Sequence, residues 1–188
     1  FFVVVFSILL ISGCTTAFVT GASKAVLIEK EERSFGNFVE DTIILEQKKN
    51  AYFSNNEKIF FNVSVEVLEG KVLLTGSVEQ VAERIEATKL AWSIEGVNEV
   101  INEIQISNDD SIFDYADDLV IKTKIKAKLL LNENIFNLNY SVEVVNGVVY
   151  LIGIAQNKEE LDRVINISEN TYGTKNIISY VRLKENKI

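Results

Sequence analysis

The chain has 188 residues, of which 47% are hydrophobic and 24% are charged, and its formal net charge is −8 at pH 7. This composition is typical of a globular protein with one or two small domains. A protein that wraps nucleic acid needs a basic surface, so the acidic balance argues against nucleic-acid binding by the whole chain. The chain has no His and a single Cys, which excludes internal disulfides, Cys–Cys metal sites and the commonest general base.

The N-terminal residues have the pattern of an export signal. Residues 1–13 are apolar and uncharged, which is the length of a signal-peptide core and too short for the roughly 20 residues of a spanning helix. Since a signal peptide begins with Met and a few basic residues, we expect a short basic segment ahead of Phe1.

The apolar run ends in an aliphatic residue, small residues and Cys14, which resembles the lipobox of bacterial lipoproteins. That resemblance implies cleavage before Cys14 and acylation at this residue. The alternative is a buried core helix with an incidental Cys, but the position, the spacing and the single Cys favour the lipobox. The residue after the Cys is Thr15 and not Asp, which in a Gram-negative lipoprotein indicates the outer membrane.

The chain contains an internal duplication with an offset of 77 residues, and such self-similarity indicates a repeated structural unit. Residues 64–67 recur unchanged as residues 141–144. Three glycines keep the same offset, namely Gly70, Gly76 and Gly96 with Gly147, Gly153 and Gly173. The register needs no gap from residues 41–106 to residues 118–183.

Each copy predicts five elements in the order αββαβ. Asp41 and Asp114 begin the first helical pattern of each copy and suit an N-terminal turn, where the helix dipole favours negative charge. Asn146-Gly147 is a strong signal for a type I′ hairpin turn, and Gly76 and Gly153 within strands indicate a bulge or a close backbone approach. The predicted helices are residues 41–53, 81–93, 114–131 and 158–172. In the first copy, the predicted strands are residues 63–68, 72–78 and 97–106. In the second copy, a hairpin pair of strands around Asn146-Gly147 precedes a last strand in residues 177–183.

The fold class that follows is α+β, with two tandem αββαβ modules. Each module is a three-stranded mixed sheet, in which a hairpin pairs the first two strands and a helical crossover brings in the third. Two helices cover one face of each sheet. The other face is left to meet solvent, the sister module or a partner.

The residues that carry these elements resemble a BON domain. The first copy has Val65, Val67, Gly70, Val72, Leu74 and Gly76, then a helix, then Gly96, Val97, Val100 and Asn102. The second copy keeps the hairpin part, whereas Thr174 and Ser179 replace the last Val–Asn pattern. A lipobox followed by two BON domains is similar to the proteobacterial outer-membrane lipoproteins of the division- and stress-associated lipid-binding class. This resemblance implies a periplasmic location, no catalysis, phospholipid contact and support of outer-membrane integrity.

The domain organisation follows from the signal, the repeat and the resemblance. We expect a signal peptide in residues 1–13, a lipidated N-terminus and linker in 14–36, a first BON domain in 37–107, a linker in 108–113 and a second BON domain in 114–184.

The first helix of the second copy is the predicted phospholipid-binding element. Its residues Ile121, Ile125 and Leu129 form an apolar stripe suited to the sheet. The opposite side carries Leu119, Val120, Ala127 and Leu130, with Lys122 and Lys126 on one flank and Lys124 and Lys128 on the other. Such a helix can bury one face in its module and press the other into an anionic bilayer. Alternatively, the outward face packs against the first module and the lysines are a solvated rim.

Two functional hypotheses follow. The first is a lipid-anchored protein of the outer membrane, facing the periplasm, that binds anionic phospholipid membranes through its second BON domain and supports outer-membrane integrity. The second is a non-enzymatic scaffold that docks outer-membrane assembly proteins through an exposed strand edge. The sequence has no nucleophile with a base, no metal-ligand set and no phosphate loop, so we predict no enzyme, no cofactor and no metal. Trp92 is expected in the core.

Overall fold

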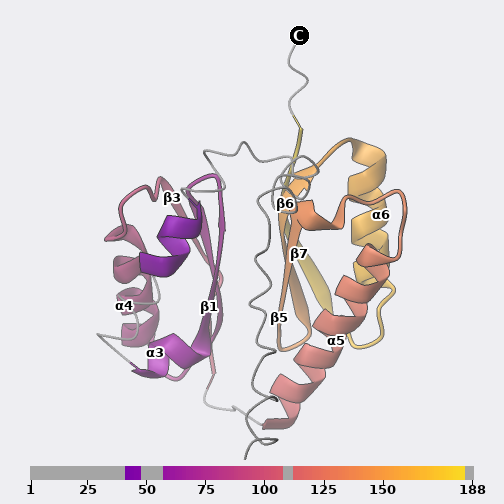
Figure 1. Cartoon of the computed structure of the whole chain (residues 1–188). Coiled ribbons are helices and arrows are strands. Elements are labelled where there is room, and N and C mark those ends of the chain that lie inside the picture. Colours follow the sequence, from indigo (N-terminus) through magenta and orange to yellow (C-terminus); the bar gives the residue numbers. More distant parts are fainter. Residues whose placement is uncertain (1–40, 48–56, 108–111, 185–188) are drawn as a thin grey trace, which may run out of the picture.

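The structure is a computed structural model that describes residues 41–47, 57–107 and 112–184. Two modules lie side by side, each with its sheet toward the other module and its helices on the outer side (Figure 1). The predicted signal peptide, Cys14 and the predicted linker of residues 14–36 lie outside the described residues. In the described part, no helix is both long enough and apolar enough to cross a membrane.

The first module has the predicted αββαβ order, with one added short helix. Residues 41–47 are helical, and residues 48–53 of the predicted first helix lie outside the described residues. The labelled elements are α3 (Glu57–Asn62), β1 (Val63–Leu68), β2 (Lys71–Val78), α4 (Val81–Trp92), β3 (Glu99–Asn102) and β4 (Gln105–Ile106). β1 is antiparallel to β2, whereas β3 and β4 are both parallel to it. The sheet is therefore mixed, as predicted.

The second module repeats this arrangement. Its elements are α5 (Ile112–Leu130), the 3-10 helix η1 (Asn137–Asn139), β5 (Tyr140–Val145), β6 (Val148–Ala155), α6 (Lys158–Glu169) and β7 (Asn176–Leu183). β5 is antiparallel to β6 and β7 is parallel to it. β5, β6, α6 and β7 each begin 77 residues after β1, β2, α4 and β3. The two copies thus share one fold, and below, two residues with this offset are called counterparts.

The third strand of the first module is interrupted, whereas that of the second is continuous. The predicted strand 97–106 forms as β3 and β4. Asn102 Oδ1 accepts a hydrogen bond from the backbone N–H of Ile104 at 3.0 Å, and such a local turn competes with the strand ladder. The counterpart of Asn102 is Ser179, whose hydroxyl lies 3.4 Å from the backbone N of Val181, and there the ladder runs unbroken.

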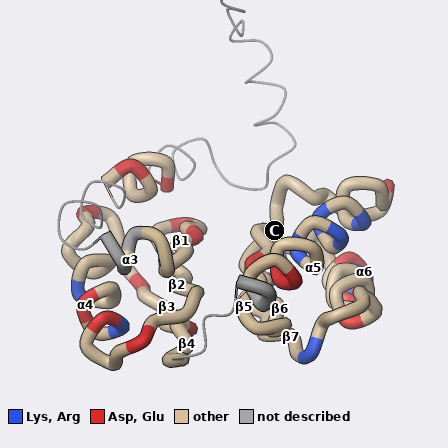
Figure 2. The backbone as a smooth tube through the Cα atoms, turned by 90° about the horizontal axis from the view of Figure 1, so that it is seen from below, with Lys and Arg blue, Asp and Glu red and all other residues tan. Residues whose placement is uncertain are grey.

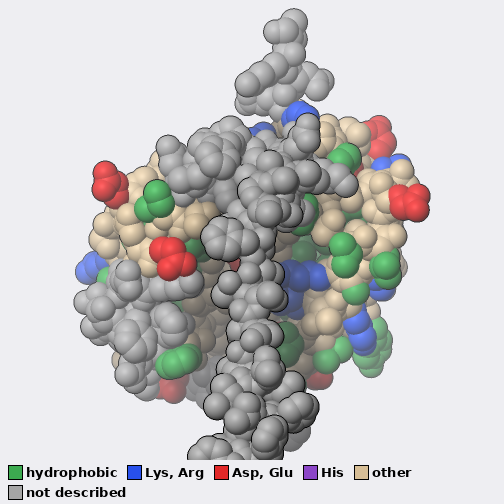
Figure 3. Space-filling view, in the orientation of Figure 1, with side chains coloured by type: hydrophobic (Ala, Val, Ile, Leu, Met, Phe, Trp, Pro, Cys, Tyr) green, Lys and Arg blue, Asp and Glu red, His purple; other side chains and the backbone are tan. Residues whose placement is uncertain are grey.

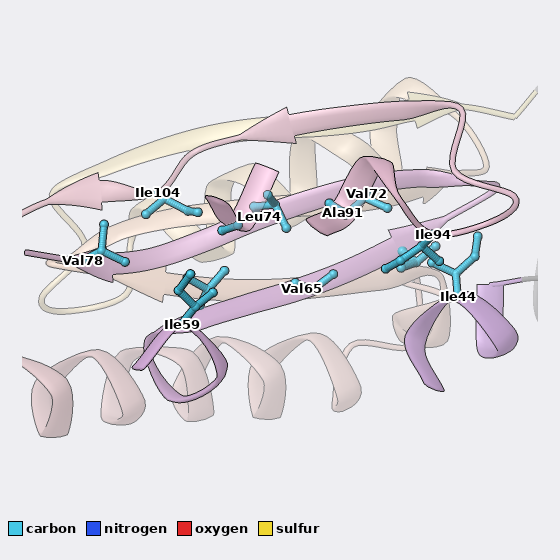
Figure 4. Packing of buried hydrophobic residues seen from close by; sticks show 12 residues of the cluster. Ile44, Ile59, Val65, Val72, Leu74, Val78, Ala91, Ile94 and Ile104 are labelled. Carbon is cyan, nitrogen blue, oxygen red and sulfur yellow. The ribbon is translucent and has the colours of Figure 1, made fainter. Parts of the chain in front are cut away.

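Each module has its own apolar core between the sheet and the helices. In the first module, Val65 and Leu74 of the sheet meet Ile59 and Ala91 of the helices (Figure 4). In the second, the predicted stripe of α5 is buried against the sheet, with Ile125 fully covered. Burying one such side chain contributes roughly 1.5–3 kcal/mol, so each sheet is held to its own helices.

Gly76 and Gly153 mark close backbone approaches and not bulges, because the antiparallel pairing of each hairpin runs one residue to one up to these glycines, without an extra residue. A Cβ on Gly76 would lie 2.0 Å from the carbonyl oxygen of Asn62, and one on Gly153 would lie 2.3 Å from that of Asn139. A side chain at either position would collide with the backbone that enters the first strand of its module.

Both hairpin turns are clamped by an aspartate of the first helical segment. The two turn residues of each hairpin have positive φ, as a type I′ turn requires. The Asp118 carboxylate accepts hydrogen bonds from the backbone N–H groups of Asn146 and Gly147 at 2.6 and 2.7 Å. Asp41 accepts the equivalent pair, from Glu69 and Gly70, at 2.9 Å each. Asp118 therefore lies within α5, one turn after the predicted helix start at Asp114, and binds a turn 28 residues away.

The face of each sheet that carries no helix packs against the sister module. We call this contact the seam. Its apolar cluster comprises Leu68, Leu73, Val145, Tyr150, Ile152 and Ile154, all buried. Since a module near 70 residues is only marginally stable alone, this shared cluster makes the two modules one packing unit.

Polar contacts across the seam occur in matched pairs. Asn146 Nδ2 donates to Gln105 Oε1 at 2.8 Å. Their counterparts also bond to each other, because the Arg182 guanidinium donates to both carboxylate oxygens of Glu69 at 2.7 and 2.8 Å. The same two positions of the repeat therefore bond to each other twice, once in each direction across the seam. Such a contact is isologous, as in a two-fold symmetric dimer.

One pair of counterparts brings like charges together in the seam. Glu66 of β1 interacts with Glu143 of β5, which is only 7% exposed. Burial raises the pKa of Glu66, and the negative charge of Glu143 raises it further, while a hydrogen bond with Ser141 and the charge of Lys126 act in the opposite direction. The seam is therefore strained electrostatically at this point when both glutamates are ionised.

The hairpin clamp can be tested by Asp118→Ala. We expect this change to lower the free energy of unfolding, measured by urea denaturation, by about 3 kcal/mol, because two hydrogen bonds to a charged acceptor are lost. Asp117→Ala is the matched control, since it removes the same charge from an exposed position of the same helix and should change stability by less than about 0.5 kcal/mol. Equal losses in the two variants would contradict the clamp.

The buried charge of the seam can be tested by Glu66→Gln. Because folding raises the pKa of Glu66, its contribution to stability is present below the ordinary glutamate pKa and is lost as the pH rises through the raised value. The variant should therefore be more stable than the parent at about pH 7 and equal to it at about pH 4. Denaturation at both pH values measures this, with Glu95→Gln, at an exposed position, as the control. A variant less stable than the parent at neutral pH would refute the argument.

Candidate functional site

The helix α5 lies on the outer side of the second sheet, along β5 and beside α6 (Figure 1). Ile121, Ile125 and Leu129 are buried in the core of the module. Successive helical residues are about 100° apart, so the residues between these three point outward or to the flanks. This orientation decides which of the predicted site residues can meet a partner.

The apolar residues predicted for membrane contact all lie on the exposed face of α5. Leu119, Val120 and Leu130 are 51%, 49% and 66% exposed, and Ala127 is exposed as well. Over this region, hydrophobic and basic side chains lie close together on the surface (Figure 3). Among the residues that the structure describes, the seam's apolar cluster contains none from α5. The alternative in which this face packs against the first module is therefore wrong, because the two sheets form the seam themselves.

Two of the four predicted lysines are engaged within the module. Lys122 Nζ lies 2.6 Å from Glu143 Oε1, at the edge of the seam. Lys128 Nζ donates to the Thr171 hydroxyl at 2.9 Å, and so ties α5 to the end of α6. These ammonium groups have carboxylate or hydroxyl partners that an external phosphate would have to replace.

The other two lysines lie on the flanks of the exposed apolar face. Lys124 and Lys126 are exposed, and basic residues follow one another along α5 (Figure 2). Lys124 Nζ lies 6.0 Å from the centroid of the Tyr172 ring, within the range of a cation–π contact. Tyr172 is itself 90% exposed. The outward face therefore has one exposed ammonium group toward α6 and another toward β5.

The exposed apolar surface continues beyond the predicted residues. Leu131 follows the end of α5, and Phe136 and Leu138 lie at η1, which contacts α5. All three are exposed. The buried carboxylate of Glu160 holds this loop, because it accepts a hydrogen bond from the Phe136 backbone N–H at 2.8 Å. The sequence signals this surface only through residues 136–139, in which apolar residues alternate with Asn, and these residues lie outside the helical pattern of α5.

Strand edges, which the scaffold hypothesis needs, are present in both sheets. Within the described residues, β7 pairs only with β6, and β3 and β4 pair only with β2.

Trp92 was expected in the core, but the structure places it on the surface. It is 53% exposed, because the last turn of α4 directs Ala91 inward and Trp92 outward. Among the described residues, no group of three His, Cys, Asp or Glu side chains is placed to hold a metal ion.

Comparisons with known proteins agree with this architecture. Among relatives, a protein of Anaplasma centrale named "Uncharacterized protein in gshII 5'region" is 42% identical over 151 residues, which cover 80% of this chain and 99% of that protein. The "Osmotically-inducible protein Y" of Escherichia coli (strain K12) is 29% identical, with 88% of this chain and 83% of that protein covered. The "Outer membrane lipoprotein DolP" of Haemophilus influenzae is 27% identical, with 89% and 87% covered.

The sequence profile described as "BON domain" matches residues 41–108 and again residues 117–185. These two matches span most of the chain, and they coincide with the two copies of the αββαβ fold. The chain belongs to the BON domain family and carries two copies of its domain.

Proposed function

We propose that this chain is a non-catalytic lipoprotein of the outer membrane, anchored through Cys14 and facing the periplasm. Its second BON domain contacts anionic phospholipid through the outward face of α5, and this contact supports outer-membrane integrity. The observation that carries the proposal is the exposed apolar face of α5 with Lys124 and Lys126 on its two flanks.

The anchor and the location are supported by the N-terminal sequence and by a relative. The lipobox-like residues end in the only Cys of the chain, and a relative that covers 89% of this chain is named an outer membrane lipoprotein. Two membrane signals already give stable anchoring, so an acylated Cys14 would hold the modules at the membrane.

The surface of α5 has the chemistry that a phospholipid interface requires. Leu119, Val120 and Leu130 would leave water on contact, at about 25 cal/mol per Å² of apolar surface. Each lysine near an anionic surface contributes about 1 kcal/mol. An isolated contact of this size is weak, but a covalent anchor raises the local concentration of the membrane surface. The anchor and the helix would thus act together.

The lipid contact can be tested with Lys124→Gln and Lys126→Gln in one chain that starts at residue 15. Such a chain includes both cores and the seam, which lie within residues 41–184. We expect binding to vesicles that contain anionic phospholipid to weaken by about 2 kcal/mol, or roughly 30-fold, in a sedimentation assay. Added salt should weaken binding by the parent, because exposed charges are screened.

The matched control is Lys158→Gln with Lys175→Gln, which removes two exposed lysines of the same module that lie off α5. The control should bind like the parent. Lys122 and Lys128 are kept, because their contacts with Glu143 and Thr171 would make a loss of binding ambiguous. If both double variants lost binding equally, net charge and not α5 would explain it, and the proposed site would be refuted.

The anchor is tested separately with Cys14→Ser in the full chain. Cells grown with radioactive palmitate should label the parent and leave the variant unlabelled, because no other thiol exists in the chain. Equal labelling of the variant would exclude Cys14 as the acylated residue.

A further inference from the structure

A groove of about 340 Å³ lies along α4, on the outer side of the first module. Its apolar walls are Val81, Ile85 and Trp92 of α4 together with Ile106 of β4. These side chains are between 44% and 57% exposed. We call this feature the α4 groove.

The sister module shows that the fold does not require this apolar surface. The counterparts of Val81, Ile85 and Trp92 are Lys158, Asp162 and Glu169, and the first two form an ion pair at 2.8 Å. Nearer the sheet, α4 is the more polar helix. It has Arg84 and Thr88 where α6 has the apolar residues Leu161 and Ile165, which pack on the second core. The two helices cover the same kind of sheet, but apolar and polar side chains have exchanged places between their inner and outer positions. Covering the sheet therefore does not explain the exposed apolar residues of α4, and exposed apolar patches commonly mark interaction sites.

The polar side of the groove is rigidly built. The Arg84 guanidinium donates to the side-chain and backbone oxygens of Asn102, each at 3.3 Å. Asn102 Nδ2 donates to the Thr88 hydroxyl at 2.6 Å. Asn102 is also the residue at which the third strand breaks. The network that separates β3 from β4 thus fixes one wall of the groove before any partner arrives, and preorganisation of this kind favours binding.

The charge of the groove selects for an acidic ligand. Of the described residues, its lining includes Arg84 and Lys89 and no carboxylate, although the chain carries a net charge of −8. Asn102 accepts from two of the five N–H donors of Arg84, so the guanidinium retains donors for a second acceptor. Trp and Arg are the residue types most enriched where protein interfaces concentrate their binding energy.

The position of the groove favours a protein over the bilayer. α4 and α5 lie on opposite outer sides of the paired sheets (Figures 1 and 2). A bilayer in contact with α5 would leave the α4 groove facing away from it. This step rests on the proposed function, whereas the lining and charge of the groove do not.

We propose that the α4 groove docks a peptide segment of another protein, one that presents an aromatic or aliphatic side chain next to a carboxylate. The apolar side chain lies against Trp92 and Ile85, and the carboxylate meets Arg84 and Lys89. The second BON domain, with charged residues at the same positions, lacks this site.

The test uses the chain from residue 15 and a variant, Val81→Lys with Ile85→Asp, that copies the sister module and so keeps residues known to suit this fold. A phage-displayed library of random dodecapeptides is depleted on the variant and then selected on the parent. A synthetic peptide of the enriched sequence is titrated while the emission of Trp92, the only Trp of the chain, is recorded. Urea denaturation of the variant confirms that it is folded.

We expect enriched peptides to pair an apolar residue with Asp or Glu. The peptide should shift Trp92 emission to shorter wavelength and should bind the variant about tenfold or more weakly than the parent. Conversion of its acid to the amide should weaken binding several-fold. No enrichment, or enrichment of peptides without acid, would overturn the proposal. A shift of Trp92 emission by phospholipid vesicles alone would assign the groove to a membrane instead. None of these readouts depends on Lys124 or Lys126, so they are separate from the test of α5.

Discussion

The constraint that organises this molecule is that two copies of one sheet pack face to face. Because the contact is isologous, residues near its pseudo-two-fold axis meet their own counterparts. Apolar positions satisfy this rule easily, and Leu73 and its counterpart Tyr150 lie in one buried cluster. Acidic positions do not, since a duplicated glutamate meets a glutamate. The chain resolves one such conflict by divergence, because Tyr180, the counterpart of Glu103, donates its hydroxyl to that carboxylate. At Glu66 and Glu143 both carboxylates remain, and lysines of α5 lie beside them.

With the inner faces committed to each other, the two modules differ mainly on their outer helices. α5 has lysines around an apolar face, α4 has apolar residues around a groove, and α6 has charged residues where α4 is apolar. The clamped hairpins and the close approaches at Gly76 and Gly153 are the same in both copies. The shared fold thus comes from contacts within each module and across the seam, while separate tasks can be assigned to the outer surfaces. This division leaves the two proposed binding surfaces on outer helices that the shared fold does not constrain.

Much of the fold could be predicted because its signals are local in sequence. The Asn146-Gly147 turn, the αββαβ order and the repeat offset depend on residues within a few positions or on direct self-comparison. The contacts that were missed join distant residues. The clamp by Asp118 was missed because its hairpin partners are 28 residues away. The bond from Asn102 to Thr88 of α4 likewise joins distant residues, and periodicity cannot reveal it. Trp92 was expected in the core because of its residue type. Its exposure is decided instead by its place on α4, one residue after the buried Ala91. The faces of α5 were predictable because helical periodicity alone sets them.

The roles of the four lysines of α5 could not be separated by charge or spacing, since only their partners distinguish them. Lys122 is the lysine most closely tied to the seam. If it left Glu143 for a lipid phosphate, that nearly buried carboxylate would stay beside Glu66 without its closest counter-ion, and an unpaired buried charge is strongly destabilising. Recognition through Lys122 would therefore oppose the packing of the two modules. Lys124 lies outside this conflict. Lys126, whose charge lowers the pKa of Glu66, is exposed and does not form the ion pair with Glu143. The same helix can thus hold the seam with one lysine and present others to a membrane surface, provided that these tasks stay on different residues.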